Sequence, residues 1–378
     1  MMLAGAAAVV AAGAGAYTLA LRRHLPKAAV IDLYRKGLEA QRQGLPDQTL
    51  QAVSYLQEAV RIDPDYADAW GGLALSYRHR LETDPAIDQA VVASWIAAAA
   101  DHALRLDPNN ADGQVAKIII RPNYRNWTSV EADYRAALKR YPDHWLLRGT
   151  FGRLMYSVGR WNDGLPAFRA NVAADSFLPM SRCFLGHGLW QSGRWQEAET
   201  TIESAFARWP SHPAIWFQRF DFLAHTGRAA AAIAFAGNVP GRPLGLPEDR
   251  FSDLVMTAQA LDSGATRDIA AAVDAALAAA KRGPEAIPAT VQVLAAFGEL
   301  GPAFELLDSY FLEKDVTRTP AAKIGPLTRR DTDFLFTQPT AALRQDPAFR
   351  RLTQTIGLEA YWATSGVPPD YRRTAAGT

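Results

Sequence analysis

Apolar side chains recur along most of the chain at steps of three and four residues, which is the spacing of one face of an α-helix. Trp70, Leu73 and Tyr77 show this spacing clearly. Side chains on such a face become buried when the helix packs against a neighbour. The pattern therefore predicts an all-α protein whose helices each bury one face.

The helical pattern repeats every 34 residues. Pro108, Pro142 and Pro210 are separated by 34 and by twice 34 residues, and Ser176 stands at the position between the last two. A proline disfavours α geometry in the residue before it, so each proline marks the end of one helix pair and the start of the next. A period of this length is typical of stacked helical hairpins.

Small residues follow the same period. Gly159, Gly193 and Gly227 each precede an arginine, and glycine there suits the left-handed residue that ends a helix. Gly152 and Gly186 fall where the two helices of a hairpin must approach closely. We expect a larger side chain at either position to overpack this crossing.

These residues resemble the tetratricopeptide repeat, a helical hairpin with Trp, Leu-Gly, Tyr, Ala and Pro at fixed positions. The clearest unit begins at Ala67, carries Trp70, Leu73 and Tyr77, and ends at Pro108. This unit is roughly ten residues longer than the family's repeat. The resemblance implies a right-handed superhelical solenoid of antiparallel helix pairs, with a concave groove that binds an extended or helical peptide.

The pattern divides the chain into five expected segments. Residues 1–21 form a membrane anchor or signal segment, and 30–236 hold the repeats. Residues 237–249 contain several Gly and Pro and predict a loop, and 250–312 hold further helical pairs. Residues 313–378 are expected to cap the last exposed core face, because a solenoid needs a covered end.

The segment Met1–Leu21 contains no charged residue and is followed by Arg22 and Arg23. A helix of this length spans roughly 31 Å, about the thickness of a bilayer's hydrocarbon core, so we expect a single-pass transmembrane helix. A cleaved secretory signal is an alternative, because Ala14–Ala16 fits a cleavage site, and an ordinary helix is another. The basic residues favour a cytoplasmic remainder, but a domain ahead of Met1 would place it in the periplasm, so both locations stay open.

The composition and the missing motifs argue against several classes of function. The formal charge of +1 is too balanced for a nucleic-acid-binding surface, and a single cysteine, Cys183, excludes an internal disulfide and a Cys-based zinc site. The sequence holds no phosphate-binding loop, no H-E-x-x-H and no G-x-S-x-G motif. No two histidines lie three or four residues apart on one predicted helix. We therefore expect neither an enzyme nor a metal, a cofactor or a small-molecule substrate.

The layout is also similar to the repeat region of bacterial membrane signalling proteins, in which a winged-helix regulator or adenylate cyclase precedes the membrane span. Residues 34–37 and 59–66, the apolar run before them, and the ending at 346–349 and 361–362 carry this similarity. It implies two functions. The chain is a membrane-tethered interaction scaffold, or it is a sensory region separated from its effector domain. An effector encoded ahead of Met1 would favour the second.

The repeat register predicts which side chains line the concave groove: Arg78, His79, Asn123, Arg153, Tyr156, His187, Trp190, Gln191, Phe217, Asp221 and His225. This aromatic and mildly basic set suits a protein or peptide partner that offers an apolar anchor and a carboxylate. We expect Trp190 to hold the anchor and Arg153 to hold the carboxylate. Packing between adjacent units is the alternative for Trp190 and Tyr156.

Overall fold

The computed structural model describes residues 24–83, 87–312 and 330–375. These residues form α-helices, short 3₁₀ helices and connecting turns, with no β-strand among them, so the all-α prediction is confirmed. The predicted membrane helix Met1–Leu21 lies outside the described residues. Within the described ranges, every helix is either too short or too polar to cross a bilayer.

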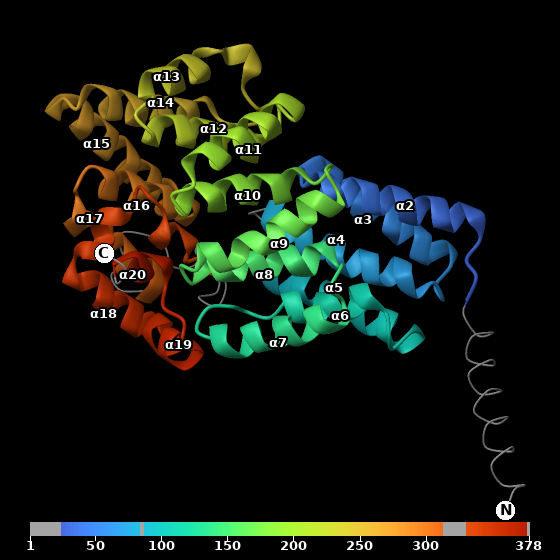
Figure 1. The fold of residues 1–378 in the computed structure, drawn as a ribbon. Coiled ribbons are helices and arrows are strands. Elements are labelled where there is room, and N and C mark those ends of the chain that lie inside the picture. The colour runs from blue at the N-terminus through green and yellow to red at the C-terminus, as the bar shows by residue number, and fades with distance from the viewer. Residues whose placement is uncertain (1–23, 84–86, 313–329, 376–378) are drawn as a thin grey trace, which may run out of the picture. The chain divides into compact units, whose positions relative to one another are not determined.

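The chain divides into two compact units, residues 1–117 and 118–378. The first unit contains α2 (Ala28–Gln43), α3 (Pro46–Ile62), α4 (Ala67–Thr83) and α5 (Gln89–Leu106), and α6 (Ala111–Ile119) runs across the boundary. Helices α2 and α3 pack as one pair and α4 and α5 as the next, with α3 against α4 (Figure 1). The boundary therefore falls inside the predicted repeat region 30–236.

The second unit continues the helix pairs. Its first helices are α7 (Trp127–Arg140), α8 (Trp145–Ser157), α9 (Trp161–Ala174), α10 (Pro179–Gln191), α11 (Trp195–Arg208), α12 (Pro213–His225) and α13 (Ala229–Gly237). Each packs against the next in chain order, and α10 also packs against α12, the first helix of the following pair. This arrangement is that of stacked helical hairpins.

The turns inside the pairs are nearly identical. The three predicted glycines have φ angles between 72° and 75°, a region that L side chains rarely adopt. The arginine after each glycine donates its N–H to the carbonyl five residues earlier, at 2.9 Å for Arg160 and Arg194 and 3.2 Å for Arg228. This hydrogen bond defines the Schellman motif and satisfies carbonyls left open at the helix end. The predicted left-handed glycines are confirmed.

Beyond the short 3₁₀ helix Val239–Gly241, the pairing resumes. The helices are α14 (Glu248–Ser263), α15 (Thr266–Arg282), α16 (Ile287–Ala296) and α17 (Leu300–Leu312), within the predicted range of further helical pairs. Gly298 has a φ of 80°, and the N–H of Glu299 donates to the carbonyl of Leu294 at 2.8 Å. The same helix-ending turn therefore recurs after the break.

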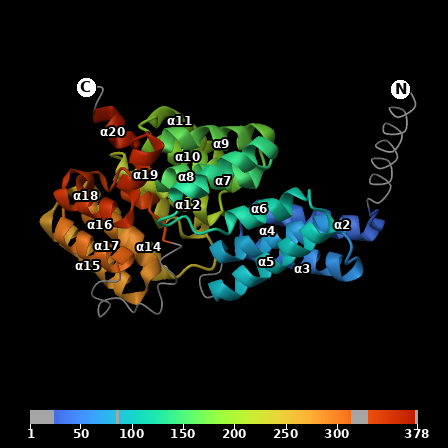
Figure 2. The ribbon, with the colours of Figure 1, turned by 90° about the horizontal axis from the view of Figure 1, so that it is seen from below.

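The C-terminal segment folds back on the second unit. It contains the 3₁₀ helices η5 (Asp333–Phe336) and η6 (Ala341–Gln345), followed by α18 (Pro347–Ile356), α19 (Leu358–Ser365) and α20 (Asp370–Ala375). It packs against α16 and α17, where an end cap belongs. It also contacts α7 and α8 at the beginning of the same unit (Figures 1 and 2). The capping expected from the sequence thus accounts for only part of its contacts.

Candidate functional site

The structure places most of the predicted groove residues on one side of α8, α10 and α12, but several of them are buried. Tyr156 is 1% exposed and Trp190 is 2% exposed. The ring of Trp190 lies 5.6 Å from Phe222 and 6.4 Å from His225, both on α12. Packing between adjacent units, the alternative that the sequence left open, is what the structure shows for Trp190 and Tyr156.

Arg153 and Gln191 contact the C-terminal segment. Arg153 attracts the carboxylate of Asp333, whose pKa is raised by burial and lowered in part by that attraction. Gln191 Oε1 accepts the backbone N–H of Gln338 at 2.6 Å. A carboxylate of the chain itself, that of Asp333, therefore interacts electrostatically with Arg153.

Three predicted residues on α12 are only partly buried: Phe217, Asp221 and His225. They follow each other at steps of four residues, so they lie on one stripe of the helix, which we call the α12 face. Arg250 of α14 lies over the ring of Phe217, with its guanidinium carbon 4.4 Å from the ring centre. The α12 face thus combines an aromatic ring, a carboxylate and an imidazole.

Burial changes the charge states along this side of the helices. It raises the pKa of Asp221 to about 7, although Arg250 acts in the opposite direction. It lowers the pKa of His187 and of His225 to about 4, so both imidazoles are neutral at pH 7. The Asp221 carboxyl forms no hydrogen bond or ion pair with any residue that the structure describes. It is a partly buried acid that lacks a donor.

Two buried donors nearby are also unsatisfied. Trp190 Nε1 and Gln191 Nε2 have no hydrogen-bond partner among the described residues. A buried polar group without a partner costs roughly 1 to 3 kcal/mol, so such groups usually bind a water or a ligand. The side of α10 and α12 that was predicted to bind a partner is therefore polar and incompletely satisfied.

The remaining predicted residues lie on other elements of the chain. Arg78 and His79 lie on α4 in the first compact unit. Asn123 lies in the loop before α7, where its backbone carbonyl accepts the N–H of Asn126 at 2.8 Å and its buried side-chain oxygen has no partner among the described residues. Within the second unit, the predicted residues of α8, α10 and α12 lie on successive helix pairs.

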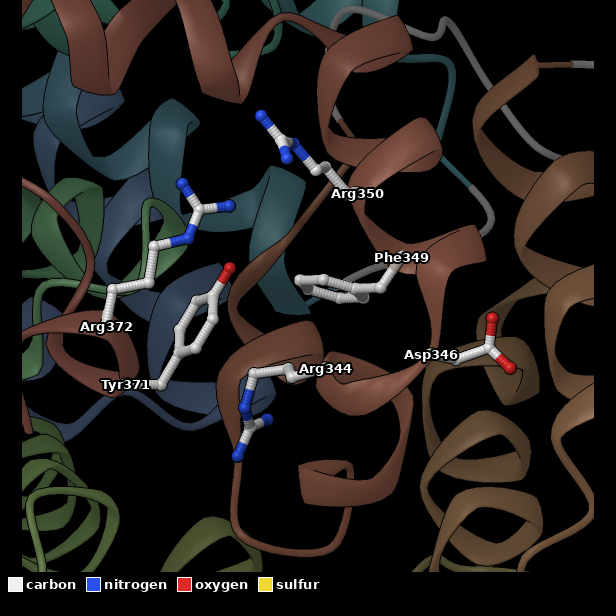
Figure 3. A pocket seen from close by; sticks show the side chains of 6 residues that line it. All are labelled: Arg344, Asp346, Phe349, Arg350, Tyr371 and Arg372. Carbon is white, nitrogen blue, oxygen red and sulfur yellow. The ribbon is translucent and has the colours of Figure 1, made fainter. Parts of the chain in front are cut away.

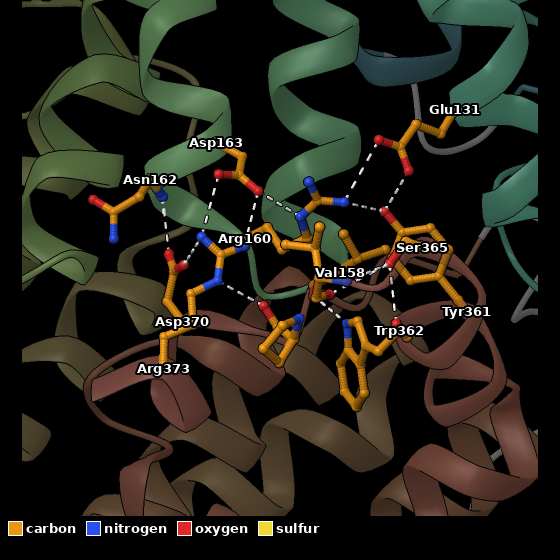
Figure 4. Close-up of polar contacts among 12 residues, drawn as sticks. Glu131, Val158, Arg160, Asn162, Asp163, Tyr361, Trp362, Ser365, Asp370 and Arg373 are labelled. Carbon is orange, nitrogen blue, oxygen red and sulfur yellow. Dashed lines mark hydrogen bonds and ion pairs between the residues drawn. The ribbon is translucent and has the colours of Figure 1, made fainter. Parts of the chain in front are cut away.

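Sequence reasoning missed the network that attaches the C-terminal segment (Figure 4). Arg160 donates through Nη1 to the hydroxyl of Tyr361 at 2.8 Å, and that hydroxyl donates to Glu131 at 2.7 Å. Arg160 also donates to Asp163 at 2.5 Å, and Arg373 donates to Asp163 at 2.9 Å. Burial alone would raise the pKa of Asp163, but the hydrogen bonds from Arg373 and Arg160 outweigh it and lower the pKa.

Backbone groups of the turn between α8 and α9 complete this attachment. Trp362 Nε1 donates to the carbonyl of Val158 at 2.9 Å, and the N–H of Asp370 donates to the carbonyl of Gly159 at 2.8 Å. The residues involved are 200 or more positions apart, and no periodic signal links them. Arg160, which follows a turn glycine, and the pair Tyr361 and Trp362 stood out in the sequence, but nothing there indicated these contacts.

Two observations concern metal binding and thiol chemistry. Across the described ranges, no group of three or more His, Cys, Asp or Glu residues is arranged to hold a metal ion. Burial raises the pKa of the Cys183 thiol to about 12, so the thiolate that would act as a nucleophile is scarce at neutral pH.

Comparison with known proteins agrees with the repeat geometry. Residues 185–243 match the family model described as tetratricopeptide repeat. This segment contains most of α10, all of α11, α12 and α13, and the two Schellman turns at Gly193 and Gly227. A comparison with curated proteins gives no match.

Many solved structures resemble the chain, including the following three. A tetratricopeptide repeat protein from Parabacteroides merdae is 14% identical, with 66% of this chain and 91% of that chain covered and a TM-score of 0.37. Yeast Tom70 is 13% identical, with coverages of 88% and 69% and a TM-score of 0.41. The Cut9-Hcn1 hetero-tetramer of APC/C is 14% identical, with coverages of 77% and 54% and a TM-score of 0.49.

The likeness to this family rests on the matched segment and on the turns that recur in it, because the structural likenesses are distant. Helix pairs of the same kind precede and follow that segment. Residues 185–243 are therefore similar to the tetratricopeptide repeat.

Proposed function

We propose that this chain is a membrane-tethered scaffold that binds a segment of a partner protein on the α12 face, with Asp221 as the group that recognises it. The observation that supports this most directly is the Asp221 carboxyl, which is partly buried and lacks a hydrogen-bond donor among the described residues. A lysine, an arginine or a backbone N–H of a partner segment supplies that donor. Such a charge-assisted hydrogen bond contributes about 1.5 to 3 kcal/mol.

The neighbours of Asp221 favour a peptide over an ion. Phe217 and His225 lie four residues before and after it, so a segment that runs along α12 meets a ring, a carboxylate and a neutral imidazole in turn. The aromatic ring provides the apolar contact that the sequence assigned to Trp190. Aromatic side chains of this kind often dominate the energy of an interface.

Position-specific photo-crosslinking tests the binding face. A photoreactive phenylalanine analogue replaces Phe217 in one version of the full chain and Asp274, an exposed residue of α15, in another. Both versions are expressed in the native cell. We expect a partner to crosslink from position 217 and not from position 274. Equal crosslinking from both positions, or crosslinking from 274 alone, contradicts binding on the α12 face.

The tether is the second part of the proposal, and the uncharged run Met1–Leu21 supports it. Deletion of residues 1–21 should move the protein from the membrane fraction to the supernatant and leave its helical circular dichroism unchanged. N-terminal sequencing of the mature protein separates an anchor from a cleaved signal. A deletion variant that stays with the membrane, or that loses its helical signal, contradicts the tether.

A further inference from the structure

The C-terminal segment contains a cavity of about 390 Å³ that is lined by six residues of η6, α18 and α20 and the turn before α18 (Figure 3). They are Arg344, Asp346, Phe349, Arg350, Tyr371 and Arg372. Three of the six are arginines and one is an acid. The size is within the range of small-molecule sites, which begins at roughly 300 Å³.

The charges around this cavity are not balanced by the chain. Arg372 forms hydrogen bonds to both oxygens of Glu359, so this pair is neutral as a whole. Arg344 and Arg350 form no ion pair with any described carboxylate. Asp346 is the remaining acid, and its Oδ1 accepts the N–H of Ala348 at 2.7 Å, which caps α18. An excess of positive charge therefore faces the cavity.

Arg344 is fixed in place and partly buried. Its Nη1 donates to the carbonyls of Leu335 and Thr337 at 3.0 and 2.9 Å and to the hydroxyl of Thr340 at 3.0 Å. These acceptors are neutral, so they satisfy the donor without cancelling the charge. Burial lowers the pKa of Arg344 to about 10, as expected for a cation without a counter-ion.

Arg350 is exposed, and its guanidinium group forms no hydrogen bond or ion pair with the described residues. It acts electrostatically on Glu359, but the oxygens of that carboxylate already accept bonds from Arg372 and Thr353. Figure 3 shows the polar ends of Arg350, Arg372 and Tyr371 on one side of the cavity, whereas Asp346 points away from them. The Arg350 guanidinium thus has its donors available there.

The aromatic rings form the rest of the site. Arg344 and Arg372 both stack on the ring of Tyr371, with guanidinium carbons 5.8 and 5.4 Å from its centre. Phe349 is almost fully buried and provides an apolar wall. The Tyr371 ring therefore contacts two cations, and its hydroxyl lies on the same side of the cavity as the guanidinium groups of Arg350 and Arg372 (Figure 3).

We infer that this cavity is a binding site for an oxyanion of the phosphate or carboxylate type, with Arg350 as the principal donor and Tyr371 and Arg372 beside it. A guanidinium group presents parallel N–H donors that match the oxygens of such an anion. The sequence predicted no small-molecule ligand, because these arginines lie outside the repeat pattern. The site is separate from the α12 face and does not depend on the proposed function.

Calorimetric titration of the full chain in detergent micelles, at constant ionic strength maintained with chloride, tests this site. Inorganic phosphate is the first probe and acetate is the second, so that the two types of oxyanion are distinguished. We expect saturable binding of at least one probe. An anion that binds only the folded state also raises the melting temperature as its concentration increases.

Two variants of α18 make the test specific. Arg350→Gln should weaken binding about tenfold or more, because it removes a charged donor from the site. Arg351→Gln removes the same charge from the next residue of the same helix, outside the cavity, and should leave the affinity within about twofold of wild type. Both residues are exposed, so both variants should fold. Absence of saturable binding to either anion, or equal loss in the two variants, overturns the site.

Discussion

A close helix crossing in the repeat region predicts the effect of one added methyl group. A Cβ at position 152 on α8 would lie 2.5 Å from Cε2 and 2.9 Å from Cζ of Phe168 on α9. Carbon atoms in ordinary contact are about 3.5 to 4.0 Å apart, so the Phe168 ring would have to move by roughly 1 Å. The rings of Tyr156 and Phe184 lie 5.2 and 5.3 Å from that of Phe168 and block the movement.

Two opposing effects determine how much Gly152→Ala changes the free energy of unfolding. Overpacking a close-packed core costs about 1 to 3 kcal/mol, whereas alanine in place of glycine inside a helix stabilises by about 1 kcal/mol. The net loss should therefore be about 1 kcal/mol, which lowers the melting temperature by about 2 to 4 °C in a unit of this size. Thermal unfolding followed by circular dichroism at 222 nm measures this change.

Gly149 on the same helix provides a control of opposite sign. A Cβ there would lie 3.5 Å from Asn171 Nδ2 and 3.9 Å from Phe168 Cε1, which are ordinary contacts. Gly149→Ala should therefore gain only the helix propensity and raise the melting temperature. Gly152→Ala should destabilise the protein less when Phe168 is replaced by Leu, because the phenylalanine ring is the group that clashes with the new methyl group. If Gly152→Ala were as stabilising as Gly149→Ala, the assigned crossing would be wrong.

Three further predictions concern buried groups. Trp190→Ala should lower the free energy of unfolding by about 3 to 5 kcal/mol in urea titrations, because the indole is part of the core; an unchanged midpoint would contradict its burial. Tyr361→Phe should cost about 1 to 3 kcal/mol, because it removes the hydroxyl that joins Arg160 to another helix; a melting temperature equal to wild type would argue against that link. Acidification from pH 6.5 to 4 should destabilise the fold, since burial lowers the pKa of His187 and His225 to about 4 and the unfolded chain then binds protons that the folded chain does not. The variant with both histidines replaced by Gln should lose less stability over that range than wild type, and an equal loss in both proteins would contradict the assigned shifts.

The periodic part of the fold was predictable because its determinants are local. Gly159, Gly193 and Gly227 mark helix ends through a backbone conformation that glycine adopts without strain, so their spacing alone locates the turns. Gly152 and Gly186 likewise lie against Phe168 and Ile202 of the partner helix, as their positions in the repeat suggested. Local rules of this kind can be inferred from one sequence.

The C-terminal contacts were not predictable by the same reasoning. Arg160 and Tyr361 are 201 residues apart, and nothing in a 34-residue period relates them. The same segment also interacts with two residues of the predicted groove. Asp333 interacts electrostatically with Arg153, and the N–H of Gln338 donates to Gln191. Position in the repeat could not show which side chains of the predicted groove the chain itself covers.

The affinity of a crosslinked partner for variants at Asp221 tests the central claim most directly. The partner captured from position 217 is purified, and its dissociation constant is measured with wild type, Asp221→Asn and Asp274→Asn. We predict that Asp221→Asn weakens binding about tenfold or more and that Asp274→Asn, an exposed change of the same charge, leaves it unchanged. Because the pKa of Asp221 is about 7, wild-type binding should also weaken from pH 8 to pH 5 as the carboxylate is protonated. A folded Asp221→Asn variant that binds the partner as tightly as wild type would contradict the account.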